Sequence, residues 1–133
     1  EEQDHLYKFG LNMGIAFQLK DDLLDVFGAP ESFGKQVGGD ILANKKTFLY
    51  LKAMQLADDS TKRDLEGYYA NSESSDNKVN AVKDIFKSLN IQKHTIDIMS
   101  SYSIKAIKHL DIISSKNKDV LLLFLKKLME RVS

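Results

Sequence analysis

Large apolar residues recur at intervals of three and four between Leu6 and Phe27. Steps of this size place side chains along one face of an α-helix. The remainder of the chain contains one proline and no run of alternating apolar and polar residues, and its spacing predicts helices over 46–57, 61–69, 77–89, 90–113 and from 119 onward. We therefore expect an all-α fold, with residues 1–133 forming a single helical unit.

Three aspartates interrupt the first of these helices. Asp21 and Asp25 are four residues apart and share a face, and Asp22 lies about 100° around the helix. Such like charges destabilise a helix by a few tenths of a kcal/mol unless something binds between them. Mg²⁺ prefers carboxylate oxygens and is often shared between one or two carboxylates and substrate phosphates. A solvated acidic face is the alternative, but the apolar helix favours a cleft or the edge of a core.

Lysines follow the aspartates at a short distance. Gly28 and Pro30 predict the end of the helix. Lys35 then lies in a glycine-rich segment, and Lys45 follows Asp40 by five residues. The lysine ammonium is a flexible point charge that suits phosphate. Any one of these lysines taken alone is better explained as an ordinary solubilising side chain, so the indication of a phosphate site comes from the combination with the acids.

The segment 14–47 resembles a known motif. Its two parts, FQxxDDxLDxxG and GKxxGxDxxxxKxT, are similar to the second aspartate-rich region of the trans-isoprenyl diphosphate synthases, or polyprenyl synthetases. The matching residues are Phe17, Gln18, Asp21, Asp22, Leu24, Asp25, Gly28, Gly34, Lys35, Gly38, Asp40, Lys45 and Thr47. The match covers roughly a quarter of the chain, and the remainder fits only as helix.

This resemblance implies a helical fragment of the isoprenoid (terpenoid) synthase fold and a Mg²⁺-dependent prenyltransferase. Asp21 would coordinate Mg²⁺, with Asp22 and Asp25 acting largely through water. Lys35 and Lys45 would contact the allylic diphosphate. The two residues expected near the reacting carbons are Phe17 and Gln18. The implied reaction joins the allylic diphosphate to isopentenyl diphosphate as diphosphate departs.

The resemblance reaches only the second of the family's two aspartate-rich motifs. The other acidic pair, Asp58–Asp59, has no third acid at the offset that the motif requires, and it reads as a turn with a helix start, capped by Ser60 or Thr61. We therefore expect the C-terminal part of a synthase roughly twice as long, inactive alone. The alternative is a non-catalytic helical subunit or interaction module that retains the fold. A first motif with nearby arginines in the parent chain would favour the enzyme.

Composition adds several expectations. Nineteen basic and nineteen acidic residues cancel, which gives no indication of nucleic-acid binding. Without cysteine, disulfides and thiolate chemistry are excluded. No apolar run approaches a membrane span, and we expect a cytoplasmic protein whose parent is a homo-oligomer, by resemblance a dimer. The histidines His5, His94 and His109 lie far apart in no ligand spacing, which favours structural roles for them.

Overall fold

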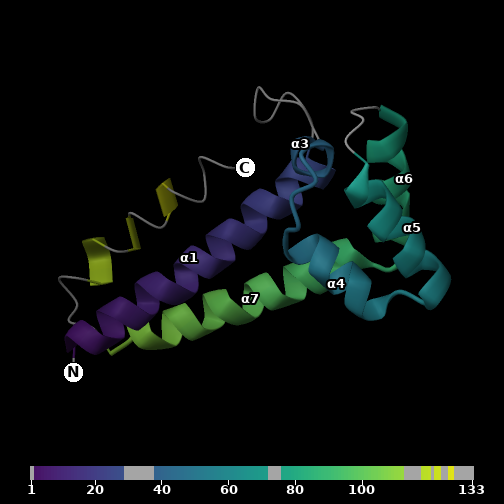
Figure 1. Ribbon diagram of the computed structural model, residues 1–133. Helices are drawn as coiled ribbons and strands as arrows, with labels where there is room; N and C mark the ends of the chain where they lie inside the picture. Colours follow the sequence, from purple (N-terminus) through teal and green to yellow (C-terminus); the bar gives the residue numbers. More distant parts are fainter. Residues whose placement is uncertain are drawn as a thin grey trace. The chain divides into compact units, whose positions relative to one another are not determined.

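The computed structural model describes residues 2–28, 38–71 and 76–112, together with 118–120, 122–123 and 126–127. Its helices are α1 (Glu2–Phe27), α3 (Gly39–Leu42), α4 (Phe48–Leu56), α5 (Asp59–Ala70), α6 (Asp76–Ser88) and α7 (Ile91–Leu110), shown in Figure 1. No β-strand occurs in these described ranges, so the all-α prediction is confirmed. No helix among the described residues is long and apolar enough to cross a membrane.

The chain divides into two compact units. One consists of 1–20 with 97–133, and the other consists of 21–96. The expectation that residues 1–133 form one helical unit stays a prediction.

The unit 21–96 is built around α6. This helix packs against α3, α4 and α5, and its apolar residues recur at the intervals that the sequence predicted. The core of this unit consists of Leu23 and Val26 of α1, Ile41 of α3, Leu49, Tyr50 and Ala53 of α4, Leu65 and Tyr69 of α5, Val79, Val82 and Phe86 of α6, and Ile91 of α7. Burial of these side chains is the main stabilising contribution in this unit.

The other unit contains a smaller core in which the first turns of α1 pack on the last turns of α7 (Figure 1). Phe9 and Met13 of α1 contact Ala106 and Leu110 of α7. Each pair is four residues apart, so each helix presents one face to the other.

Several helix boundaries differ from the predicted ones. Helix α4 begins two residues later than expected, and the four-residue α3 was not predicted, because one turn is too short to show a periodic pattern. Leu51 of α4 is 58 % exposed, so this helix is less buried than its composition indicates.

The N-cap of α5 is Asp58, which corrects the prediction that Ser60 or Thr61 would cap this helix. The Asp58 Oδ1 accepts the Thr61 backbone N–H at 2.8 Å. These hydrogen bonds from Thr61 lower the pKa of the Asp58 carboxyl, because they stabilise its charged form. The helix is therefore capped two or three residues earlier than predicted, and the cap satisfies the Thr61 backbone N–H, which has no partner within the first turn of the helix.

Candidate metal and diphosphate site

The three aspartates lie on the last two turns of α1. Asp21 is half-buried, whereas Asp22 and Asp25 are each only 6 % exposed. A buried carboxylate needs hydrogen bonds or a positive charge to offset its lost hydration. A freely solvated acidic face is therefore excluded for Asp22 and Asp25.

Asp25 joins the aspartate-rich turn to the segment that starts at Gly38. Its side-chain Oδ2 accepts the Asp40 backbone N–H at 2.9 Å. Its backbone carbonyl accepts the Gly38 N–H at 2.6 Å. The chain returns beside α1 at this point, and Asp40 is brought next to Asp25 although fifteen residues separate them.

Gly38 permits this return. Its φ of +89° lies in the left-handed region that favours glycine. A Cβ at this position would lie 2.6 Å from the Val79 Cγ1, which is closer than real side-chain contacts come. The match of Gly38 to the family motif thus has a physical reason, since the backbone packs directly on α6.

A buried lysine holds the next turn of the chain. Lys78 of α6 is 4 % exposed, and its Nζ donates to the Asn44 Oδ1 and, at 2.8 Å, to the Asn71 carbonyl. Asn44 itself adopts a φ of +56°, and its Nδ2 donates to the same Asn71 carbonyl at 3.2 Å. These contacts fix the turn that immediately precedes Lys45, whose side chain is exposed.

Sequence reasoning missed Lys78, although a signal was present. Lys78 lies four residues before Val82 and eight before Phe86, on the same apolar stripe of α6. A lysine on a core stripe is rarely buried unless it is paired, so its position indicated a hydrogen-bonded ammonium.

Two tyrosines pack beside the acidic residues. The Tyr50 and Tyr69 ring centroids are 4.3 Å apart, at an angle of 48°. Burial raises the pKa of Tyr69, and the charges of Tyr50, Asp40 and Asp25 raise it further. Tyr69 therefore experiences the electrostatic field of the Asp25 and Asp40 carboxylates, a role that the sequence did not indicate.

A cavity of about 290 Å³ lies next to this tyrosine pair. Its lining consists of Lys46, Tyr50, Glu66, Tyr69 and Ala70. The Lys46 Nζ lies 5.6 Å from the centre of the Tyr50 ring, within the range of a cation–π interaction. Lys46, which directly follows the motif residue Lys45, thus borders a cavity in the same unit.

The remaining predicted site residues are Lys35, Phe17 and Gln18. Lys35 lies outside the described residues. Phe17 is half-buried and Gln18 is exposed, and both belong to the unit 1–20 with 97–133. Their roles stay predictions.

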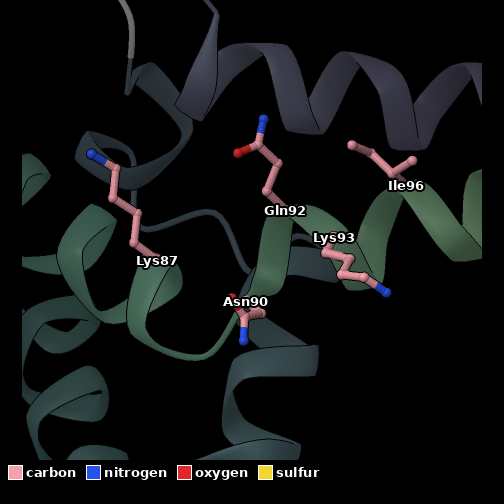
Figure 2. Close-up of a pocket in the computed structure, with 5 residues that line it drawn as sticks. All are labelled: Lys87, Asn90, Gln92, Lys93 and Ile96. Atoms are coloured by element: carbon pink, nitrogen blue, oxygen red, sulfur yellow. The ribbon is translucent and has the colours of Figure 1, made fainter.

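A second cavity, of about 360 Å³, lies at the turn between α6 and α7. It is lined by Lys87, Asn90, Gln92, Lys93 and Ile96 (Figure 2). Figure 2 shows the amines of Lys87 and Lys93 pointing away from each other. Among the described lining residues there is therefore no converging pair of cations, and none of the predicted site residues that the structure describes is among them.

The carboxylates on α1 suit a Mg²⁺ ion that is also bound by the phosphates of a substrate. Among the described residues no three His, Asp or Glu side chains are grouped so that they could hold a metal by themselves. Mg²⁺ bound through one or two carboxylates needs no such group, because water and phosphate oxygens complete its octahedron. Asp21 and Asp25 supply hard oxygens one turn apart, and the hydrogen bond from Asp40 orients the second of them.

The family model of polyprenyl synthetase matches residues 1–87 of this chain. The chain belongs to the polyprenyl synthetase family. It is 33 % identical over 113 residues to a geranylgeranyl diphosphate synthase of Saccharolobus solfataricus, covering 85 % of this chain and 34 % of that relative. It is 36 % identical over 122 residues to a farnesyl pyrophosphate synthase of Candida albicans, covering 90 % of this chain and 34 % of that relative.

A solved structure of a geranylgeranyl pyrophosphate synthase superimposes with a TM-score of 0.82 at 40 % identity. The alignment covers 99 % of this chain and 42 % of that structure. The predicted fold, the all-α isoprenoid synthase fold, is thereby confirmed. This polyprenyl synthetase chain spans about a third of the length of the curated relatives that it matches.

Proposed function

We propose that this chain is the part of a Mg²⁺-dependent trans-prenyltransferase that carries the second aspartate-rich motif. The whole enzyme would condense an allylic diphosphate with isopentenyl diphosphate in isoprenoid biosynthesis. The observation that carries the proposal is the hydrogen bond from the Asp40 N–H to Asp25. It links the carboxylates of α1 to the segment that presents Lys45, and Asp21, Asp25 and Lys45 all belong to the compact unit 21–96.

Each residue then has a defined task. Asp21 would hold Mg²⁺ directly, and Asp22 and Asp25 would act largely through water. Lys45, together with Lys35, would bind the diphosphate as point charges. When bound, Mg²⁺ supplies electrostatic stabilisation to the leaving diphosphate. Phe17 and Gln18 would line the pocket near the reacting carbons.

We further propose that the 133 residues alone do not catalyse the condensation. One metal motif and one diphosphate site cannot orient two substrates, and orientation can supply roughly 7–11 kcal/mol of a barrier. The purified chain, free of host enzyme, should form no product from isopentenyl diphosphate and an allylic partner. Measurable turnover by the chain would contradict this part of the proposal.

Binding tests the site without requiring turnover. We expect the purified chain to bind inorganic diphosphate in a Mg²⁺-dependent manner in titration calorimetry. Asp21→Asn should weaken this binding about ten-fold or more, because one charged oxygen ligand of the metal is lost. Lys45→Ala should weaken it less, since the metal still neutralises the diphosphate.

Matched controls come from exposed residues of the same types. Asp84→Asn on α6 and Lys8→Ala on α1 should leave Mg²⁺-dependent binding unchanged, because both side chains are exposed and lie outside the motif. Binding that does not require Mg²⁺, or an equal loss in Asp21→Asn and Asp84→Asn, would overturn the proposed site.

A further inference from the structure

Two histidines meet in the unit 1–20 with 97–133. The His5 Nδ1 lies 3.0 Å from the His109 Nδ1, although 104 residues separate them in sequence. The ring centroids are 5.2 Å apart, and the ring planes are inclined by 35°. Both rings are half-buried. A neutral imidazole has one donor and one acceptor nitrogen, so one ring donates from Nδ1 and the other accepts.

This spacing is close to that of two imidazoles on one metal ion. Tetrahedral Zn²⁺ with Zn–N bonds of 2.0–2.1 Å places two ligand nitrogens about 3.3 Å apart. The corresponding ring centroids would lie about 5.2 Å apart, because each centroid is roughly 1.1 Å behind its nitrogen. Neighbouring positions of a square-planar Cu²⁺ or Ni²⁺ would bring the nitrogens to about 2.9 Å. The rings would need to pivot about their present centroids rather than move apart.

We propose that His5 and His109 form a binding site for a divalent transition metal such as Zn²⁺. Both Nδ1 lone pairs would bind the ion, and the proton now shared between them would move to Nε2 of the donating ring. Because no third His, Asp or Glu completes a group in the described part of the chain, water would fill the remaining positions. The site is therefore open and exchangeable.

The site differs chemically from the magnesium site proposed on α1. Imidazole nitrogen suits Zn²⁺, Cu²⁺ and Ni²⁺, whereas Mg²⁺ takes oxygen ligands. The two histidines also belong to a different compact unit from Asp21 and Asp25. Binding at one site can thus be measured independently of binding at the other.

A metal at this position would reinforce an existing contact between α1 and α7. His5 precedes Phe9 by four residues, and His109 follows Ala106 by three, so both histidines continue the faces that pack Phe9 and Met13 on Ala106 and Leu110. A bridging ion would fasten the first turns of α1 to the last turn of α7. Since the unfolded chain does not hold the two rings together, metal binding should stabilise the folded state.

The test uses the chain without a histidine tag, stripped of metal with a chelator. Zn²⁺ alone should bind at one equivalent in competition with a chromophoric chelator, and it should raise the thermal midpoint by several degrees. His5→Gln and His109→Gln should each weaken Zn²⁺ binding at least about ten-fold, since even residues that only orient a metal ligand cost 10–100-fold. His94→Gln is the matched control and should bind Zn²⁺ like the wild type.

NMR spectroscopy of the wild-type chain tests the proposal even if one of the variants does not fold. On addition of Zn²⁺, ¹⁵N spectra of the imidazoles should show Nδ1 shifts for two of the three histidines. Undiminished Zn²⁺ affinity in both His5→Gln and His109→Gln, or no shift of two Nδ1 signals in the wild type, would overturn the proposal. Mg²⁺-dependent diphosphate binding should persist in both variants, which separates this result from failure of the proposed function.

Discussion

At the scale of single residues, the carboxylate of Asp25 makes a structural contact in addition to its proposed role at the metal. It belongs to the aspartate-rich motif, and it also accepts the Asp40 N–H that positions the start of α3. Substitution of Asp25 therefore mixes loss of a proposed metal contact with loss of a structural one. Different substitutions at this position can separate the two effects.

Asp25→Ala should lower the free energy of unfolding by about 1–3 kcal/mol, because the Asp40 N–H loses its acceptor in a partly buried site. Asp25→Asn retains a side-chain carbonyl oxygen and should destabilise the fold less. The exposed Asp84→Ala should change stability by about 0.5 kcal/mol or less. Urea unfolding measures all three. Equal destabilisation by the Ala and Asn variants would show that the hydrogen bond is not what holds α3.

Asp21 and Lys35 should differ in their effect on catalysis in the whole enzyme. Asp21→Ala should reduce kcat on the order of 10²–10³, the scale for loss of one preorganised electrostatic group. Lys35→Ala should cost less, because Mg²⁺ partly compensates, and His94→Ala should stay near wild type. Steady-state kinetics with the allylic substrate varied would test this order. Near-normal turnover of a folded Asp21→Ala enzyme would contradict the metal assignment.

Tyr69 should titrate late in alkali. Burial and the charges of Tyr50, Asp40 and Asp25 raise its pKa, so it stays neutral where an unfolded tyrosine with pKa of about 10 ionises. The native state then binds more protons than the unfolded state, and stability falls as the pH rises above about 10. Ultraviolet titration should show one fewer late-ionising phenol in Tyr69→Phe. In Asp25→Asn the pKa of Tyr69 should fall. An unchanged pKa would show that the Asp25 carboxylate is too far from Tyr69 to affect it.

At the scale of helices, Lys78 connects three elements. From α6 it reaches the turn after α3 through Asn44 and the end of α5 through the Asn71 carbonyl. The stability of the turn before Lys45 thus depends on a side chain 33 residues later in sequence.

Lys78→Met should lower the free energy of unfolding by about 1.5–3 kcal/mol, the range for hydrogen bonds that involve a charged group. Lys87→Met on the same helix is the control, since Lys87 is exposed and should change stability by about 0.5 kcal/mol or less. Chemical denaturation gives both values. If the two variants are equally stable, the buried ammonium contributes nothing beyond its aliphatic stem.

The long helices could be predicted from the regular spacing of their apolar residues, but the contacts between the helices could not. Periodic spacing predicted α1, α6 and α7 closely, since each spans three turns or more. The motif placed Asp21, Asp25 and Lys45 in one candidate site. The Asp25–Asp40 hydrogen bond and the pairing of His5 with His109 depend on tertiary packing, which local spacing does not encode.

At the scale of the whole molecule, many large apolar side chains remain exposed on α1 and α7. They are Leu6, Tyr7 and Leu11 of α1, and Ile96, Ile104 and Ile107 of α7. Isolated exposed apolar residues are ordinary, whereas extended groups of them usually mark an interaction surface. This chain matches only about a third of the length of the curated relatives, so such surface is expected to be covered in the longer proteins.

We therefore expect the isolated chain to self-associate. Light scattering after gel filtration should show species larger than a monomer, in proportions that increase with concentration. The double substitution Leu11→Gln and Ile104→Gln should shift the distribution toward monomer. Lys8→Gln should not, because Lys8 is an exposed polar residue three positions before Leu11 on α1. A monodisperse monomer at high concentration would contradict the expectation.

The glycines of this chain differ in how much sequence change they tolerate. Gly14 and Gly67 lie inside helices with no atom within 4 Å of an added Cβ. Alanine at either position would gain roughly 1 kcal/mol of helix propensity, and natural variants of these positions have room to accumulate. Gly38 has no such freedom, because any side chain would meet Val79. In the isolated chain, alanine should therefore be accepted at Gly14 and Gly67, whereas a side chain at Gly38 would have to adopt a φ of +89° and displace either Val79 or the backbone beside the aspartate turn.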